Sequence, residues 1–219
     1  AVFSVLYTAF IAIKQDNFKY VLAFSSISHL SLILAAIASL DLNTGDLNNP
    51  LFKDQFGIQT LKGIVFQLFS HGIIVAGLLM IAEWIEKGSE TLDLNKMGGF
   101  AEGKRFLPIA FMVMLLGSIA LPLTSGFIGK FAIFSAAYQS GNIAIVVSGV
   151  LASAIAAFFY IRVIIMIFFT DPVNDSVSVI IPSVKSRISI TVATVISVLL
   201  GLAPSLLLNI AENFSTFIK

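Results

Sequence analysis

The hydrophobic residues of this 219-residue chain gather in long runs that short polar segments separate. A membrane-spanning helix needs about 20 mainly apolar residues, and most of these runs reach that length. The predicted helices cover residues 1–13, 18–40, 61–85, 106–139, 143–169 and 188–210. The pattern predicts an all-α integral membrane protein with about five to six transmembrane helices. The first run is too short to span a bilayer and is expected to be the end of a longer helix.

The run 106–139 is too long for one straight crossing and carries helix-breaking residues near its middle. Proline lacks a backbone N–H and clashes with the preceding turn, and glycine is a weak helix former. Pro122, Gly126 and Gly129 lie close together in this run. We therefore predict one discontinuous transmembrane helix, made of two half-helices, with its break around Pro122–Gly129.

The composition fits a lipid environment and argues against several classes of function. Hydrophobic residues make up 58% of the chain and charged residues 11%, whereas soluble domains carry roughly 25% charged residues. The net charge of +1, without a basic run, does not support a nucleic-acid partner. Without cysteine, and with two histidines, thiolate metal sites, iron–sulfur clusters and typical zinc sites are excluded. No metal, no cofactor and no redox or hydrolytic catalytic site is predicted on this chain.

Lysine and arginine are unevenly divided between the two sides of the predicted bundle. Cytoplasmic loops of membrane proteins carry an excess of these residues. One side collects Lys14, Lys19, Lys87, Lys96, Lys104, Arg105, Lys185 and Arg187, and the other collects Lys53, Lys62 and Lys219. The segments 14–19, 86–105 and 170–187 are therefore predicted to be cytoplasmic. The polar loop 41–59 and the C-terminus are predicted to face the opposite side.

Lys130 is a charged residue in the apolar sequence that follows the predicted break. A charge at the centre of a bilayer costs at least about 2.5–3.5 kcal/mol, so such residues usually face the protein interior and serve a function. No aspartate or glutamate lies at similar depth in the predicted helices to pair with it. Lys130 is therefore predicted to be a functional amine that exchanges protons.

Two predicted helices share a polar pattern in which positions i, i+3 and i+4 lie on one helical face. The residues are Ser25, Ser28 and His29 on one helix and Gln67, Ser70 and His71 on the next. Imidazole groups at membrane depth can pass protons with the help of hydroxyls and water. The pattern predicts a relay of Lys130, His29 and His71, with the serines and Gln67 in support. Alternatively, each histidine is only a hydrogen-bond partner between helices, and the serines bond to their own helix carbonyls.

Other residues have structural interpretations. Arg162 lies near the end of its predicted helix, where its side chain can extend to the lipid headgroups as an anchor. Glu83 and Lys87, four residues apart at a helix end, predict a solvated ion pair. A stripe of small residues at four-residue spacing, which lets helices approach closely, is formed by Gly149, Ser153 and Ala157.

Several stretches resemble the antiporter-like membrane subunits of respiratory complex I and the related subunits of multi-subunit cation/proton antiporters. They are KYVLAFSSISH (19–29), FQLFSHG (66–72), LPLTSGFIGKF (121–131) and SAIAAFFYIR (153–162). The resemblance covers nearly the whole chain. Residues up to about 125 are similar to M-type subunits, and residues from Phe127 onward are similar to N-type subunits.

The resemblance implies proton translocation as part of a respiratory NADH:quinone oxidoreductase. Subunits of this kind contain two inverted repeats, each with a broken helix. Residues 1–169 then correspond to the second repeat, truncated at its N-terminus, and 186–212 to the final transmembrane helix. Lys130 matches the ionisable residue of the broken helix in the outward half-channel, and His29 and His71 match the connecting histidines. The implied partners are other membrane subunits, the lipid bilayer of a bacterial inner membrane and the transported proton.

Two alternatives stay open at this point. A sodium/proton or potassium/proton antiporter subunit would carry the same polar residues, together with carboxylate or carbonyl ligands for the cation. A non-transporting membrane fragment, natural or designed, would carry Lys130 without a function and would be more stable without its charge.

Overall fold

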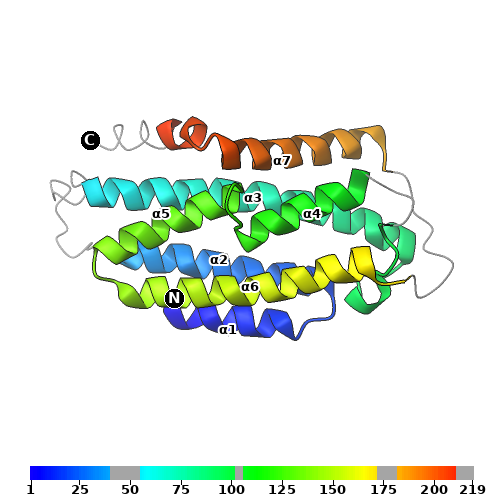
Figure 1. Ribbon diagram of the computed structural model, residues 1–219, viewed down its shortest axis with the longest axis horizontal. Coiled ribbons are helices and arrows are strands. Elements are labelled where there is room, and N and C mark those ends of the chain that lie inside the picture. The colour runs from blue at the N-terminus through cyan, green and yellow to red at the C-terminus, as the bar shows by residue number, and fades with distance from the viewer. Residues whose placement is uncertain (40–54, 102–105, 172–181, 211–219) are drawn as a thin grey trace.

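The computed structural model describes residues 1–39, 55–101, 106–171 and 182–210, which form a bundle of helices aligned with its long axis (Figure 1). The helices are α1 Val2–Ile13, α2 Phe18–Ser39, α3 Gln55–Ser89, α4 Phe106–Ile119, α5 Ser125–Gln139, α6 Ile143–Phe169 and α7 Val184–Leu202. A short 3₁₀ helix, η2 Leu94–Lys96, follows α3. No strand forms within these ranges apart from one isolated bridge pair, so the predicted all-α class is confirmed.

Four described segments are long and apolar enough to cross a membrane: Phe18–Ala38, Gln59–Gly88, Ile143–Phe169 and Val184–Leu202. α4 and α5 contain 14 and 15 residues. At 1.5 Å per residue each is about 21–23 Å long, less than the ~30 Å hydrocarbon core. Because they follow one another along the bundle (Figure 1), the two half-helices together make one crossing. The chain is an integral, multi-pass membrane protein.

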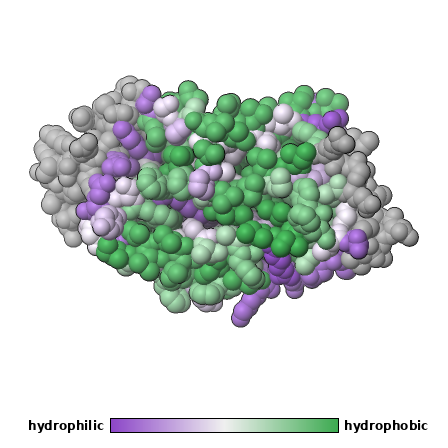
Figure 2. Space-filling view, in the orientation of Figure 1, coloured by the Kyte–Doolittle hydropathy of each residue, from purple (hydrophilic) through white to green (hydrophobic). Residues whose placement is uncertain are grey.

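The surface of the bundle suits a lipid environment. Figure 2 shows hydrophobic residues over most of the middle of one face. Large apolar side chains are exposed on several helices, including Leu34 on α2, Phe69 on α3 and Phe158 on α6. Soluble monomers rarely expose contiguous apolar patches larger than a few hundred Å². Lipid tails or membrane partners are therefore the surroundings in which this surface is stable.

The predicted helix break is confirmed, and it is short. α4 ends at Ile119 and α5 begins at Ser125, so Pro122 lies in the connecting segment. Ala120 and Leu123 have positive φ angles of 67° and 72°. The left-handed region costs non-glycine residues roughly 1–2 kcal/mol each. The break is thus held in a strained conformation by the helices around it.

Gly126 and Gly129 were predicted to belong to the break, and this was wrong because both lie inside α5. They allow close packing instead. A Cβ atom at Gly126 would collide with the carbonyl oxygen of Gly117 at the end of α4. A Cβ atom at Gly129 would lie 2.8 Å from Cα of Gln67 on α3. These glycines therefore let the backbone of α5 pack directly against the backbones of α4 and α3.

α3 is longer than its apolar run. It begins at Gln55, inside the predicted loop 41–59, and it ends at Ser89. Residues 41–54 of that loop lie outside the described residues. The 35 residues of α3 give a helix of about 52 Å, longer than the bilayer core. Hydropathy marks which part of a helix lies in lipid, not where its backbone hydrogen bonds stop, so the predicted ends fell short.

α7 is shorter than predicted. The run 188–210 was expected to form one helix, but α7 ends at Leu202 and, after a break at 203–204, residues 205–210 are helical again. Pro204 has no N–H to donate, and a residue before proline avoids the helical region. Ala203 accordingly has φ −128° and ψ 65°. Of the predicted final helix 186–212, residues 211 and 212 lie outside the described residues.

Polypeptide segments from several loops meet at one end of the bundle. The backbone N–H of Phe18 donates to the Leu92 carbonyl at 3.0 Å, and that of Leu94 donates to the Asp16 carbonyl at 2.7 Å. The N–H of Gly99 donates to the carbonyl of Thr170 at 2.9 Å. The described parts of the predicted cytoplasmic segments therefore lie together at this end. The side of the membrane that they face stays a prediction.

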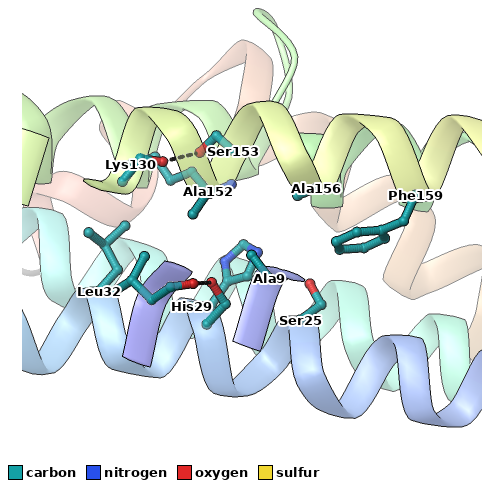
Figure 3. Close-up of a pocket in the computed structure, with 12 residues that line it drawn as sticks. Ala9, Ser25, His29, Leu32, Lys130, Ala152, Ser153, Ala156 and Phe159 are labelled. Atoms are coloured by element: carbon teal, nitrogen blue, oxygen red, sulfur yellow. Dashed lines mark hydrogen bonds between the residues drawn. The ribbon is translucent and has the colours of Figure 1, made fainter. Parts of the chain in front are cut away.

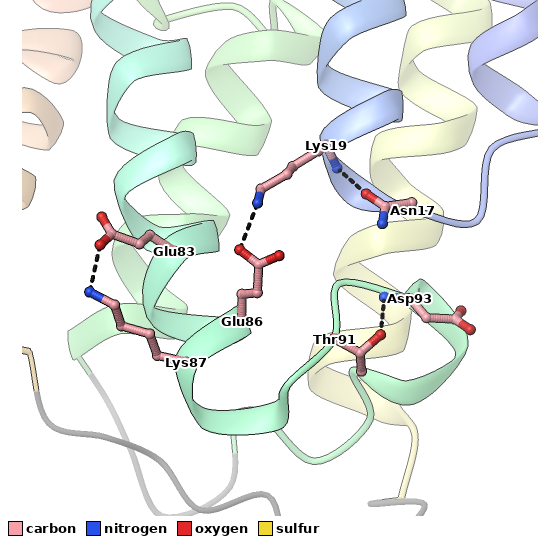
Figure 4. Close-up of polar contacts among 7 residues, drawn as sticks. All are labelled: Asn17, Lys19, Glu83, Glu86, Lys87, Thr91 and Asp93. Atoms are coloured by element: carbon pink, nitrogen blue, oxygen red, sulfur yellow. Dashed lines mark hydrogen bonds and ion pairs between the residues drawn. The ribbon is translucent and has the colours of Figure 1, made fainter.

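Two exposed ion pairs lie at the same end (Figure 4). Lys87 Nζ is 2.6 Å from Glu83 Oε1, which confirms the predicted pair on α3. Lys19 Nζ, at the start of α2, is 2.6 Å from Glu86 Oε2 near the end of α3. The second pair joins two helices, although exposed pairs of this kind contribute little to stability.

Arg162 on α6 is held by a partner that the sequence pattern does not mark. Its Nη2 atom is 2.9 Å from Asp16 Oδ1, and its Nη1 donates to the Ile13 carbonyl at 3.5 Å. The Arg162 side chain is 29% exposed and that of Asp16 is 62% exposed. Arg162 therefore ties α6 to the turn between α1 and α2.

Breaking the Arg162–Asp16 pair is expected to have a small effect. Because Asp16 is largely exposed and screened by solvent, the coupling energy in a double-mutant cycle of Arg162→Gln and Asp16→Asn should be about 0.2–1 kcal/mol. Chemical unfolding in detergent at low and high salt would measure it, with a smaller value at high salt. A salt-independent coupling of several kcal/mol would contradict this estimate.

Candidate functional site

His29 and His71 lie face to face near the middle of the bundle. Their ring centroids are 4.3 Å apart and the ring planes differ by 15°. His29 on α2 is 6% exposed. Gln67, one turn before His71 on α3, places its Nε2 atom 2.9 Å from His29 Nδ1. The two polar faces that the sequence pattern marks thus pack against each other.

Lys130 reaches the same region from α5. It is 6% exposed, and it lines a cavity together with His29, Ser25 and Ser28. Figure 3 shows Lys130 and His29 on opposite sides of this cavity. The centre of a water molecule can occupy a volume of about 20 Å³ in this cavity. This volume is enough for one water molecule.

Lys130 has no carboxylate partner in the part of the chain that the structure describes. The ion pairs found there join other residues, and the buried polar residues of the same ranges include no aspartate or glutamate. A charge on Lys130 also interacts electrostatically with both imidazoles. The amine is therefore coupled to the two histidines rather than neutralised by an acid.

Ser25 and Ser28 connect α2 to different helices. The Tyr160 hydroxyl of α6 donates to Ser25 Oγ at 2.9 Å, and both residues are buried. Ser28 Oγ donates to the backbone carbonyl of Val5 on α1 at 2.8 Å. The sequence pattern does not mark Tyr160, because a tyrosine in an apolar helix resembles any other core aromatic residue. Ser28 is held by backbone, whereas Ser25 belongs to a side-chain pair.

Ser70 bonds to the first residue after the helix break. Its hydroxyl donates to Ser125 Oγ at 2.8 Å, and Ser125 Oγ lies 3.2 Å from Ser197 Oγ on α7. All three serines are buried. Ser125 and Ser197 were not predicted, since single serines give no signal in an apolar run. These hydroxyls link α3, the start of α5 and α7.

α7 packs directly on the break. A Cβ atom at Gly201 would lie 2.8 Å from the backbone N of Ser125 and from the carbonyl carbon of Thr124. Backbone of α7 therefore supports the segment whose strained conformation separates α4 from α5.

Two buried polar atoms have no hydrogen-bond partner among the described residues: Gln67 Oε1 and His71 Nε2. Buried polar atoms are nearly always paired with protein or water. Both atoms lie on α3 beside the histidine stack, so a water molecule can bond to each of them, and His71 Nε2 is a position where a transferred proton can bind.

A metal site would need several ligands around the two imidazoles. Within the described ranges, no group of three or more histidine, cysteine, aspartate or glutamate residues lies close enough together to hold a metal ion. The polar groups that line the cavity are instead hydroxyls, one imidazole and one amine.

A sequence match covers the part of the chain that carries this site. Residues 1–156 match the family described as NADH:quinone oxidoreductase/Mrp antiporter, TM. The chain belongs to this family. The matched region extends from α1 into α6 and includes His29, His71 and Lys130.

Members of this family named subunit N are similar over nearly the whole chain. NADH-quinone oxidoreductase subunit N 3 of Streptomyces griseus is 35% identical over 220 residues, which cover 100% of this chain and 37% of the relative. NADH-quinone oxidoreductase subunit N of Mycobacteroides abscessus is 35% identical, covering 94% and 38%. The chain thus spans little more than a third of these relatives, and the N-type resemblance is not confined to residues after Phe127.

Solved structures of two membrane complexes share the fold. A chain of respiratory complex I from Thermus thermophilus with bound NADH superposes with a TM-score of 0.79 at 20% identity, covering 100% of this chain and 43% of that chain. A chain of the Mrp complex from Dietzia gives a TM-score of 0.81 at 18% identity, covering 98% and 45%. Both proteins are complexes, and at these identities the likeness concerns the fold.

Proposed function

We propose that this chain is part of a proton-translocating membrane subunit of a respiratory NADH:quinone oxidoreductase, and that Lys130, His29 and His71 relay the protons. The stacked histidines beside the Lys130 cavity carry this proposal. Three ionisable side chains from three helices meet inside an apolar bundle, and intramembrane ionisable residues usually mark ion pathways. The subunit N relatives support the respiratory assignment.

The residues have complementary tasks in such a relay. The Lys130 ammonium can release a proton to water in the cavity and take one back as a neutral amine. An imidazole accepts a proton at one nitrogen and releases one from the other. Because the His29 and His71 rings are stacked, their N–H bonds lie in nearly parallel planes and do not point at each other. A proton therefore passes between the ring edges through water rather than directly.

The stack also favours single-proton steps. Two imidazolium rings at 4.3 Å would repel strongly in a medium of low dielectric constant, and a charged Lys130 would add to the repulsion. A proton on one group thus promotes release from its neighbours. This coupling lets a change at one end of the relay move charge at the other.

The energy for transport is supplied by other subunits in this proposal. The chain spans about 37% of the Streptomyces relative, so the remaining helices of the subunit and its membrane partners complete the pathway. The described helices supply the central relay.

Proteoliposomes that contain the whole NADH:quinone oxidoreductase would test the relay. Replacing either histidine with glutamine is expected to lower the initial rate of proton uptake roughly 10²-fold, the scale of a lost acid–base group. Lys87→Gln, which removes an exposed lysine at the bundle end, is the matched control and should pump normally. Normal pumping by both histidine variants would refute the relay.

Cation/proton exchange is the second candidate, because the family that the chain matches includes Mrp antiporters. The same vesicles distinguish the two functions when sodium and potassium are replaced by choline. Proton transport that continues in choline supports the respiratory proton pathway. Transport that stops until sodium or potassium is restored identifies an antiporter.

A further inference from the structure

Gln67 faces the Nδ1 atom of His29 with its amide nitrogen. Its side-chain Nε2 atom lies 2.9 Å from His29 Nδ1, and an amide NH₂ group can only donate. His29 Nδ1 is therefore the acceptor and carries no hydrogen. A neutral imidazole holds one hydrogen, so the proton of neutral His29 lies on Nε2.

The other end of the same amide is the acceptor that a protonated ring needs. Gln67 is 1% exposed, and its Oε1 atom has no hydrogen-bond partner among the described residues. Oε1 lies against Gly129 of α5, where a Cβ atom would collide with it. A half-turn of the amide exchanges two groups of nearly equal size. The half-turn breaks only the bond to His29.

A gain of a proton by His29 favours this exchange. When a proton binds to Nδ1, the ring becomes a donor at both nitrogens and the facing amide N–H can no longer bond to it. After the half-turn, Gln67 Oε1 accepts from Nδ1–H. One N–H bond forms on His29, and one O–H or N–H bond breaks on a protonated cavity water or on the Lys130 ammonium. Either nitrogen of the ring can then release a proton.

We propose that Gln67 is a rotating hydrogen-bond partner that matches each protonation state of His29, as a donor to the neutral ring and as an acceptor from the protonated ring. The inference rests on the proposed function, which makes His29 a proton carrier. Gln67 is a positioning residue, because it acts through the imidazole. Its side chain itself holds no transferred proton.

The ionisable groups that face His29 are Lys130 from α5 and His71 from α3. The side chains that α1 and α6 contribute to the cavity wall are uncharged, such as Val5, Ala9 and Ser153. A titration of His29 must therefore be repeated with Lys130→Met and with His71→Gln. These backgrounds separate the contribution of the amide from that of the two neighbouring charges.

Nuclear magnetic resonance of ¹⁵N-labelled histidine in the protein in lipid nanodiscs tests the inference, with His29→Gln to assign the signals. In the unaltered protein, neutral His29 should favour the Nε2–H tautomer roughly tenfold, as expected for one buried hydrogen bond. Gln67→Glu offers only acceptors and should invert this preference to Nδ1–H. Gln67→Leu should remove the preference.

Gln139→Leu is the matched control, because Gln139 is exposed on α5 and bonds to Ser135. It should leave the His29 signals unchanged. The inference is overturned if neutral His29 is an Nδ1–H tautomer in the unaltered protein, or if both Gln67 variants keep the original tautomer. If Gln67→Leu does not fold, Gln67→Glu, which keeps the size of the side chain, decides alone.

The outcome is separable from that of the transport proposal. The tautomer is measured without any proton gradient, so normal pumping by the histidine variants would refute the relay and leave the spectroscopic result standing. Conversely, loss of pumping in those variants together with an unchanged tautomer in the Gln67 variants would remove only the role of Gln67.

Discussion

Replacing Lys130 with methionine is expected to stop proton translocation and to leave the fold at least as stable as before. Methionine fills a similar volume but cannot carry a proton, so the rate of proton uptake should fall roughly 10²-fold or more. The buried amine has no carboxylate partner in the described part of the chain. Exchanging buried ionic groups for apolar ones of similar volume often stabilises proteins by about 1–4 kcal/mol.

Both effects are measurable on one preparation. Proton uptake by proteoliposomes of the whole complex gives the activity, and thermal unfolding in detergent gives the stability. Lys130→Arg keeps the positive charge on a group that does not release its proton, and it should also be inactive. Lys87→Met makes the same change at an exposed site and should pump normally.

The alternative roles of Lys130 predict different combinations of stability and transport in the Lys130→Met protein. A structural lysine would lose stability and transport in parallel when replaced by methionine. A non-transporting fragment would gain stability while the whole complex pumped as before. Loss of transport with unchanged or increased stability is the combination that a functional buried amine requires.

Replacing Gly129 with alanine is expected to destabilise the bundle by about 1–3 kcal/mol, the usual cost of overpacking. The added methyl group would lie 2.8 Å from Cα and 3.0 Å from Cβ of Gln67, so α5 must move away from α3. The movement carries Lys130, the next residue, away from the histidines. Proton uptake should therefore fall along with stability.

Gly72→Ala is the matched control on α3. A Cβ atom at Gly72 meets nothing within 4 Å, and alanine is favoured over glycine in helices by about 1 kcal/mol. The two substitutions should thus shift the free energy of unfolding in opposite directions, as measured by chemical denaturation in detergent. A Gly129→Ala protein as stable as Gly72→Ala would contradict the close α3–α5 packing.

Much of the architecture follows from the sequence because lipid imposes a simple rule. Backbone polar groups cannot bond to water inside a bilayer, so an apolar run long enough to span it must be helical. This places α2, α6 and the single crossing made by α4 and α5. The break around Pro122 is also a local property, since proline disrupts the hydrogen bonds of its own helix. Lys130 is also recognisable from local sequence, because it is a charged residue inside an apolar run.

Helical periodicity also predicted which polar residues share a helix face with each histidine. The spacing of Ser25, Ser28 and His29, and of Gln67, Ser70 and His71, places each set on one face before any packing is known. It does not say which faces meet. Only the packed structure stacks the two rings, directs Ser70 to Ser125 and leaves Gln67 against His29.

Contacts between distant segments were decided by tertiary structure alone. Three contacts join residues that are far apart in the chain: the Arg162–Asp16 ion pair, the Tyr160–Ser25 hydrogen bond, and the packing of Gly201 against the helix break. No local pattern encodes such pairs, because each residue on its own fits an ordinary helix or turn. Gly126 and Gly129 show the same limit, since both could be taken for helix breakers. Their function is set by the backbone that packs against them. The sequence by itself determined which segments are apolar enough to lie in the membrane, because hydropathy is a local property. Tertiary packing decided which side chains of these segments touch.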